Sequence, residues 1–249
     1  MISLFDKYVS VSIPAENRLK NVVAKYNENE IQFIEGINLV DSIGRIKKLD
    51  YNCQYIILLP AEKIYFKSIS VAPLADFRIS EDSFLSELKE EKINFKEDYY
   101  YDYLESRSKV KEESELKFFA ADKPMLDQIT EKLDKNRNNY LVSALPVVVY
   151  SIVNELIEEE NYLFYYQIDD KYTLITVENN HLELLKPCVD KVELQFELEK
   201  IQKYYLNNKS LKLNVIEGNS SILNMDKFIE LEEDDFVFLT SVLWSVSKC

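Results

Sequence analysis

The chain has 249 residues, 47% of them hydrophobic and 12% aromatic, and its 44 acidic and 30 basic residues give a net charge of −14. Apolar and aromatic residues run through the whole length, which disfavours intrinsic disorder and fits one large or two small domains with a real core. A net-negative surface repels phosphate backbones and anionic lipids, so nucleic acid is disfavoured as a partner.

Strand-forming and helix-forming stretches alternate through the first 140 residues. Strands are predicted where branched and aromatic residues dominate, and helices where apolar residues recur every three or four positions. Gly36 is expected to close the first hairpin, and Pro60 to end a buried strand. In chain order the predicted elements are strands at 19–26 and 31–34, a short helix at 40–49, strands at 53–59 and 64–71, a helix at 81–92, strands at 98–104 and 116–121, and a helix from Pro124 to Leu133.

A similar alternation starts again near residue 141. Asp190 precedes a long helix and Glu193 follows three positions later, which is the spacing of a capping box. The predicted elements are a strand at 140–144, a helix at 146–157, strands at 162–168, 172–177 and 182–185, a helix from Asp190 with a buried stripe of Leu194, Leu198, Ile201 and Tyr205, a strand at 211–216, and a helix from Asp235 to Ser247. This order predicts α/β layers in two parts, with a hinge near 139–144.

Few side chains are suited to nucleophilic or metal chemistry. The three cysteines, at positions 53, 188 and 249, are far apart and lack CxxC spacing, which argues against a disulfide framework or a zinc site and suits a reducing cytosol. The only histidine, His181, is expected to be a solvated residue at a hairpin turn. No His-based catalytic triad can therefore be assembled.

Charged runs are expected to lie on solvated surfaces. The densest basic stretch, at 45–48, is too short to override the negative net charge. The acidic runs at 158–160 and 232–235 leave open an unrelated α/β enzyme that uses carboxylates, although such runs are more often solvated helix ends.

No segment has the length of a membrane span. The longest mainly apolar run, 141–153, contains Pro146 and is shorter than the ~20 residues that a helical span needs. Residues 236–246 form a shorter run, and the N-terminus lacks a secretory signal pattern. If the natural protein continues past Cys249, a membrane segment could follow there.

The run Leu59-Pro60-Ala61-Glu62-Lys63-Ile64, followed by Ser70-Val71-Ala72-Pro73, resembles the cytoplasmic actin-like proteins of bacterial pilus and secretion machines. These are the PilM-like pilus assembly proteins and the cytosolic domain of the GspL-like secretion proteins. In that group a Leu-Pro-Ala type turn is followed by an apolar strand, an acidic helix and an acidic-aromatic strand. The corresponding segments here are 64–73, 81–92 and 98–102, followed by a strand and helix at 117–133 and a second half that starts at 141–146.

The resemblance implies an α/β, actin-like (ribonuclease H-like) architecture of two halves, with mixed sheets flanked by helices. The first half would span residues 1–140 and include a small strand–helix subdomain at about 60–104. The second half would span residues 141–249.

The chain departs from the nucleotide-binding members of this group, which open each half with a Gly-rich phosphate loop. Glycine lets the backbone approach phosphate without a Cβ in the way. The corresponding stretches here, near 4–11 and at 166–173, contain no glycine, and neither GxxxxGK[ST] nor GxGxxG occurs. The adjacent Asp169 and Asp170 could hold Mg²⁺, but a polar turn is favoured. We therefore expect no cofactor, no bound metal and no catalysis.

The function that follows from the resemblance is a non-catalytic cytoplasmic scaffold of a type IV pilus or type II secretion platform, at the inner face of the cytoplasmic membrane. Its partners would be protein partners of the platform, either a membrane protein's cytoplasmic tail or the assembly ATPase. It would meet the membrane only indirectly, or through a segment beyond Cys249. The alternatives are an actin-like ATP-binding protein with degenerate phosphate loops and an unrelated α/β enzyme.

Tyrosines crowd one predicted strand. Because side chains alternate along a strand, Tyr99, Tyr101 and Tyr103 should share one face, with Tyr100 and Asp102 on the other. Tyrosine favours interfaces because its ring buries area while its hydroxyl stays hydrated. Tyr99, Tyr101 and Tyr103 are therefore the predicted partner-binding residues, unless the protein's own helices cover both faces.

Overall fold

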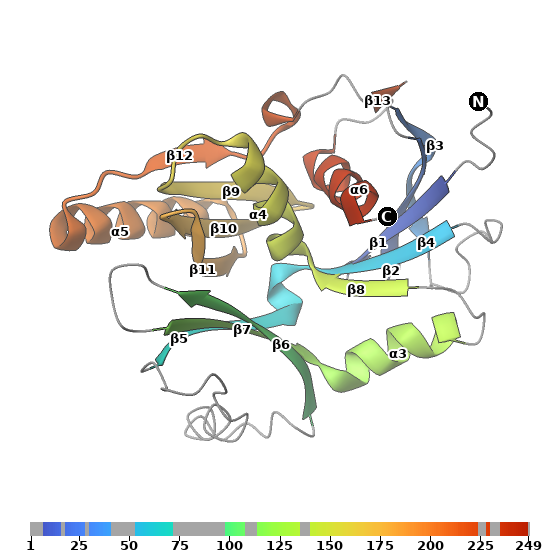
Figure 1. Ribbon diagram of the computed structural model, residues 1–249, viewed down its shortest axis with the longest axis horizontal. Helices are drawn as coiled ribbons and strands as arrows, with labels where there is room; N and C mark the ends of the chain where they lie inside the picture. Colours follow the sequence, from blue (N-terminus) through green and yellow to red (C-terminus); the bar gives the residue numbers. More distant parts are fainter. Residues whose placement is uncertain are drawn as a thin grey trace. The chain divides into compact units, whose positions relative to one another are not determined.

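The chain divides into two compact units. The first joins Met1–Ala61 with Lys132–Cys249, and the second is Glu62–Glu131. The computed structural model describes residues 7–15, 18–27, 30–40, 53–71, 98–107, 114–134, 140–223, 228–229 and 235–248 (Figure 1). The helices predicted at 40–49 and 81–92 lie outside these residues, apart from Val40, which ends a strand. The predicted boundary between two halves at residue 140 stays a prediction.

A six-stranded mixed sheet belongs to the first unit. The first strand pairs antiparallel with the second, and the second pairs antiparallel with the third. The fourth is parallel to the first, and a fifth and sixth extend the two edges. The strands are β1 (Lys7–Ala15), β2 (Arg18–Tyr26), β3 (Ile31–Val40), β4 (Cys53–Leu59), β8 (Tyr140–Ala144) and β13 (Phe228–Ile229), in the order β13-β3-β2-β1-β4-β8. The predicted hairpin across 27–30 is confirmed, with the Asn27 amide 3.0 Å from the Glu30 carbonyl oxygen.

A four-stranded sheet in the same unit repeats that strand order. Three antiparallel strands are again followed by a strand parallel to the first of them. These are β9 (Tyr162–Ile168), β10 (Lys171–Glu178), β11 (His181–Cys188) and β12 (Asn214–Glu217), in the order β11-β10-β9-β12. Asn179 and Asn180 link β10 to β11 with φ of 52° and 61°, as a type I′ turn requires.

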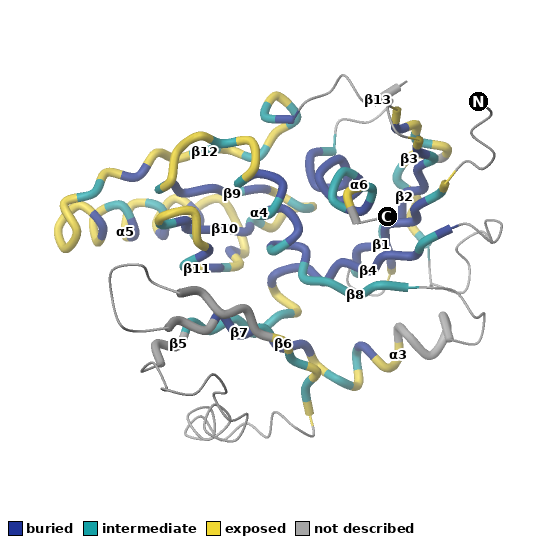
Figure 2. The backbone as a smooth tube through the Cα atoms, viewed as in Figure 1, coloured by how far each residue is buried: buried dark blue, intermediate teal, exposed yellow. Residues whose placement is uncertain are grey.

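Two helices of the first unit pack against each other and reach both of its sheets. They are α4 (Leu145–Leu156) and α6 (Phe236–Lys248); α6 contacts β1, β2 and β9, while α4 contacts β8 and β10. Their buried residues, with those of the central strands, form the core of the unit (Figure 2). The mixed sheets flanked by helices agree with the predicted α/β class.

The apolar run at 236–246 lies in a core helix, and its buried polar side chains form hydrogen bonds with the backbone of the same helix. The hydroxyls of Thr240, Ser241 and Ser245 are fully buried and donate to backbone carbonyls of the preceding turn at 2.6 to 2.9 Å. Burial of a hydroxyl is tolerated when it is hydrogen-bonded in this way. Within the described residues, no helix combines the length and apolarity that a bilayer crossing needs.

A third helix of the first unit is α5 (Lys191–Lys209). It contacts β10 and β11 and covers the face of the four-stranded sheet opposite to α4 (Figure 1). Its buried residues join those of the sheet in one apolar cluster, which consists of Leu163, Leu174, Cys188, Leu194, Ile201, Tyr205 and Leu213. The predicted inward stripe of α5 is thereby confirmed.

The second unit contains a three-stranded antiparallel sheet in the order β5-β7-β6. Its strands are β5 (Ile64–Val71), which follows a 3-10 turn at Ala61–Lys63, β6 (Tyr99–Arg107) and β7 (Ser114–Asp122). The helix α3 (Lys123–Asp134) begins directly after β7, and the Asp122 carboxylate caps it by accepting the Met125 amide at 2.8 Å.

Candidate functional site

The predicted partner-binding tyrosines lie on β6, an edge strand of the three-stranded sheet. Tyr99, Tyr101 and Tyr103 pair in register with Asp122, Ala120 and Phe118 of β7. Tyr99 and Tyr101 are half-buried, while the side chain of Tyr103 lies outside the described residues. Their assignment to a partner stays a prediction.

Part of this tyrosine face packs within the second unit. The ring of Tyr101 lies 5.7 Å from that of Phe118, which is fully buried, and Tyr65 of β5 meets Phe118 edge-on at 6.2 Å. Such aromatic contacts favour a fixed ring orientation. The remaining exposed part of Tyr99 and Tyr101 is the area that a partner could cover.

The other face of β6 presents Tyr100, which is 47% exposed. Its hydroxyl donates to Asp127 of α3 at 2.8 Å, and the Lys123 ammonium lies 5.2 Å from its ring centre. These contacts tie the strand to the first turns of α3. Tyr100 is therefore a tyrosine of the same strand that lies on the face opposite Tyr99 and Tyr101, and it can serve as a control for them.

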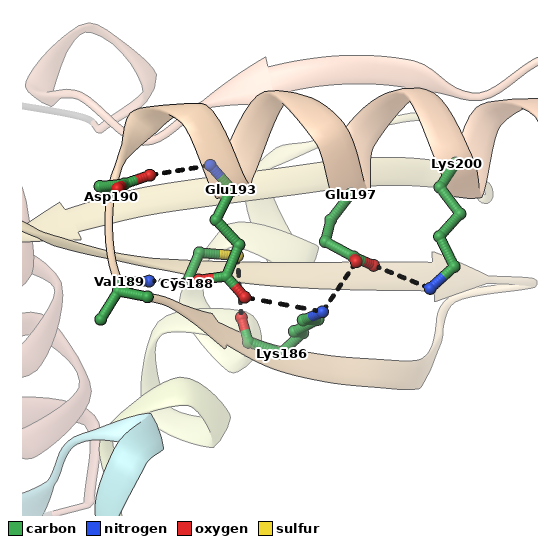
Figure 3. A network of polar contacts seen from close by, with 7 residues as sticks. All are labelled: Lys186, Cys188, Val189, Asp190, Glu193, Glu197 and Lys200. Atoms are coloured by element: carbon green, nitrogen blue, oxygen red, sulfur yellow. Dashed lines mark hydrogen bonds and ion pairs between the residues drawn. The ribbon is translucent and has the colours of Figure 1, made fainter.

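The β11–α5 corner holds a dense polar network (Figure 3). The Asp190 carboxylate accepts the Glu193 amide at 2.8 Å, and the Glu193 carboxylate accepts the Val189 amide at 2.8 Å. The contact of Asp190 with the Glu193 amide is the predicted N-cap. The Glu193 carboxylate accepts the amide of Val189, one residue before the N-cap residue whose amide it would accept in a capping box.

Lys186 of β11 joins this corner to the next turn of the helix. Its ammonium lies 2.8 Å from a Glu197 carboxylate oxygen and 3.9 Å from Glu193, and Lys200 approaches Glu197 at 3.5 Å (Figure 3). The hydrogen bond from Lys186 holds the pKa of Glu197 below its ordinary value and raises the pKa of Lys186. A carboxylate that is almost fully buried thus remains charged because two cations face it.

A second polar contact fixes the far end of α5. Glu178 at the end of β10 accepts the Tyr205 hydroxyl at 3.1 Å and pairs with the Lys209 ammonium. Lys209 also lies 4.7 Å from the Tyr205 ring centre. The helix is therefore held to the sheet at both ends, with the apolar cluster between them.

The β9–β10 turn, one of the two expected counterparts of a phosphate loop, consists of Asp169 and Asp170. Asp169 has φ of 53°, and its backbone oxygen accepts a hydrogen bond from the side-chain amide of Gln167 at 2.5 Å. Its carboxylate pairs with Lys20 of β2, so an ion pair joins the two sheets of the first unit. The other counterpart falls partly outside the described residues, and Lys7 to Val11 form the start of β1. In the described part of the chain, no group of three or more potential metal ligands occurs.

The described thiols and the histidine are poorly placed for chemistry. Burial raises the pKa of Cys53 to about 12 and that of Cys188 to about 11, so both stay protonated at neutral pH. His181 is exposed and follows the Asn179–Asn180 turn, where the sequence placed it.

The prediction for α5 covered only its buried stripe and missed the apolar residues on its outer face. The helix carries a second apolar set on its outer face, and Val192, Phe196 and Leu206 are all more than half exposed. A search for apolar residues at helical spacing outside the inner stripe would have found it.

Comparison by sequence finds no matching family model and no matching curated protein. The solved structures that are similar to this chain include three at 13% identity. The cytoplasmic domain of EpsL, an inner-membrane component of the type II secretion system of Vibrio cholerae, matches with a TM-score of 0.63 over 97% of this chain and 95% of that one. A chain of a PilM–PilN type IV pilus biogenesis complex matches at 0.59, over 87% and 83%. A Bacteroides thetaiotaomicron protein with an actin-like ATPase fold and unknown function matches at 0.53, over 98% and 99%.

These likenesses confirm the predicted fold. The chain has an actin-like α/β fold. The similar structures include pilus and secretion proteins, the group that the sequence resembles in its Leu-Pro-Ala turn and its order of elements. Identity of 13% shows the fold alone, because one fold hosts many functions.

Proposed function

We propose that this protein is a non-catalytic cytoplasmic scaffold of a type IV pilus or type II secretion inner-membrane assembly platform. It docks a membrane partner's cytoplasmic tail or the assembly ATPase. The observation that carries the proposal is the likeness to the EpsL cytoplasmic domain, which spans 97% of this chain and 95% of that one. A match that is nearly complete in both directions concerns a whole domain, whereas many unrelated proteins share only a sub-fold.

The β9–β10 turn supports a role without nucleotide. Phosphate binding by a backbone loop needs glycine for close approach and free amides that point at the anion. Here the turn offers two carboxylates, which repel phosphate, and Asp169 already pairs with Lys20. A charge pair at this place can hold the two sheets together in the absence of a ligand.

We place the docking surface on Tyr99, Tyr101 and Tyr103 of β6. The strand lies at the edge of its sheet, and the rings of Tyr99 and Tyr101 are half-buried. Half-buried tyrosines have defined orientations and lose little conformational entropy when a partner covers them. A peptide segment rich in apolar and basic residues would suit this face, given the net charge of −14.

A second candidate function is ATP binding. It is favoured by the likeness to the Bacteroides thetaiotaomicron protein described as having an actin-like ATPase fold. It requires that phosphate be held without glycine-rich loops, and a nucleotide titration separates it from the scaffold role.

The proposal is tested by deleting the gene in its native organism and measuring pilus assembly and type II secretion. Loss of one of the two processes, restored by the wild-type gene, is expected. The triple variant Tyr99→Ser, Tyr101→Ser, Tyr103→Ser should fail to restore it. Tyr100→Ser is the matched control from the same strand and should restore it.

Both variants must keep the wild-type circular dichroism spectrum and accumulate normally, since the Tyr101 ring contacts Phe118. Intact pilus assembly and secretion in the deletion strain would show the scaffold proposal to be wrong. Restoration by the folded triple variant would leave the scaffold role standing and move the docking surface away from β6.

A further inference from the structure

The outer face of α5 exposes apolar side chains that cannot turn inward. Val192, Phe196 and Leu206 are 74%, 65% and 57% exposed. The inner face of the helix is already filled by the apolar cluster, and the contacts made by Glu197 and Lys209 fix the helix about its own axis. Exposed apolar residues in a row on a fixed helix indicate a surface that another molecule covers.

These residues belong to one narrow stripe with a regular repeat. The stripe runs through Val192, Phe196, Glu199, Lys203 and Leu206, at intervals of four, three, four and three residues. An average interval of 3.5 residues keeps one line of side chains against a second helix, as in a coiled coil. The stripe therefore has the spacing of a helix–helix seam.

From residue 196 to residue 206, the positions of the stripe are symmetric about Ile201. Moving outward from that position in both directions, Glu199 corresponds to Lys203, and Phe196 corresponds to Leu206. Glu199 and Lys203 pair with each other at 3.7 Å, and their side chains are 71% and 75% exposed, so both remain accessible. The part of the stripe from 196 to 206 is thus complementary to a reversed copy of itself.

A second copy in the reversed direction gives each of the four stripe residues from 196 to 206 a complementary partner. With a two-fold axis beside residue 201, Phe196 faces Leu206 of the second copy, and Glu199 faces Lys203 of the second copy. A two-fold axis repeats each contact, so the pair is closed and does not propagate into a filament. A parallel pair would oppose like charges at positions 199 and 203 and is disfavoured.

We propose that the outer face of α5 is a self-association surface, through which two copies of this chain pair as antiparallel helices. The inference does not depend on the platform role, since it rests on α5 alone. One 19-residue helix from each copy makes a smaller contact than a stable dimer interface. The dimer is therefore reversible, with a dissociation constant on the order of 10 to 100 µM.

Sedimentation equilibrium from about 1 µM to about 1 mM chain tests the proposal. The wild-type average mass should rise from monomer towards dimer across this range. Phe196→Glu should weaken the association at least ~10-fold, because a charge replaces a central apolar contact. Val215→Glu is the matched control: Val215 is a 42% exposed apolar residue on β12, away from the stripe, and its replacement should change nothing.

Charge exchange tests the pairing of positions 199 and 203. Glu199→Lys alone and Lys203→Glu alone should each weaken self-association, whereas the two variants mixed should form a one-to-one dimer. The double variant Glu199→Lys, Lys203→Glu should associate like the wild type. Melting temperatures confirm that each variant is folded.

A wild-type chain that stays monomeric up to about 1 mM would overturn the proposal. So would a mixture of the two single variants that fails to associate. Capture of a different protein by the outer face of α5, from a chain that is monomeric by itself, would overturn it as well.

Discussion

Gly218 lies where the chain leaves β12 and passes three aromatic residues. A Cβ at this position would lie 2.7 Å from a Phe236 ring carbon, 2.8 Å from a Phe164 ring carbon and 3.0 Å from the Tyr166 Cβ. These distances are too short for carbon atoms, and the two rings pack against each other at 5.8 Å, so they have little room to move. The glycine is required by close packing.

Gly218→Ala should therefore lower stability by about 1 to 3 kcal/mol, the cost of overpacking a core. The melting temperature should fall by roughly 3 to 10 °C. Gly36→Ala is the matched control, because Gly36 is exposed and its φ is not positive. Equal melting temperatures for Gly218→Ala and the wild type would contradict this packing.

Glu197 should make stability depend on pH. Its pKa is lowered in the folded state, so its contribution is present above the unfolded value of about 4.3 and is lost as pH falls through the folded pKa. Glu197→Gln should cost about 1 to 2 kcal/mol at pH 7, because Lys186 loses its nearest partner.

The difference between Glu197→Gln and the wild type should shrink as pH falls below about 4.3, because the carboxyl is then neutral in the unfolded chain, and it should vanish below the lowered folded pKa. Urea unfolding at several pH values measures it. Glu199→Gln is the control on the same helix, because the pair of Glu199 with Lys203 is exposed and should contribute less than about 0.5 kcal/mol at any pH. A difference for Glu197→Gln that stays constant to pH 3 would show that the ion pair does not stabilise the fold.

The side-chain contacts that were predicted correctly join residues only a few positions apart in the sequence. The caps at Asp190 and Asp235 follow from a polar residue before an apolar repeat, and both accept helix amides. Lys186, in contrast, meets Glu197 across a strand-to-helix corner, and Lys20 meets Asp169 across two sheets. Such pairs depend on the tertiary arrangement, which cannot be predicted from the residues that neighbour each partner in the sequence.

At the scale of elements, β1 is the longer of two described strands that were not predicted, the other being the two-residue β13. The buried positions of β1 alternate between valine or isoleucine and serine, and serine is not expected in a core. The reason is Asn21 of β2, whose amide nitrogen lies 2.9 Å from the hydroxyls of both Ser10 and Ser12. A cross-strand polar contact thus takes the place of apolar packing.

The ends of elements were predicted less well than their existence. Gly36 was expected to close a hairpin, but β3 continues through it to Val40, with shifts in the β2–β3 register. Bulges absorb the extra residues without ending the strand. The strand predicted at 211–216 covers only Asn214–Glu217, because Leu211 still bonds to the helix end at Tyr205.

The N-cap at Asp190 predicts the local stability of α5. Asp190→Ala removes the side-chain acceptor of the Glu193 amide and should cost about 1 kcal/mol. Hydrogen exchange should speed up at the amides of the first helical turn and stay unchanged near Lys209. Asp170→Ala, in an exposed turn, should leave exchange in α5 unaffected. Unaltered protection of the first turn in Asp190→Ala would contradict the role of this cap.

At the scale of the whole molecule, the full-length likeness to actin-like structures leaves nucleotide binding as the main alternative. We expect no binding of Mg-ATP, because glycine is missing from the expected phosphate-loop stretches and the β9–β10 turn carries two carboxylates. Calorimetric titration should show no heat of binding, and about 1 mM Mg-ATP should leave the melting temperature unchanged.

A micromolar affinity would instead stabilise the fold by about 4 kcal/mol at that concentration, which a melting experiment detects easily. Such a result would favour the ATP-binding alternative. The sequence resemblance anticipated the fold at this scale because element order survives when individual residues diverge. It could not supply the partner, because a docking surface is set by exposed residues that the fold does not constrain.

The central claim is that this chain works by docking proteins of a pilus or secretion platform. Crosslinking of the native protein in its own cells, followed by affinity purification and mass spectrometry, tests that claim most directly. Crosslinked peptides should come from the cytoplasmic tail of an inner-membrane platform protein or from the assembly ATPase. Reproducible crosslinks that involve only proteins outside any pilus or secretion machine would contradict it.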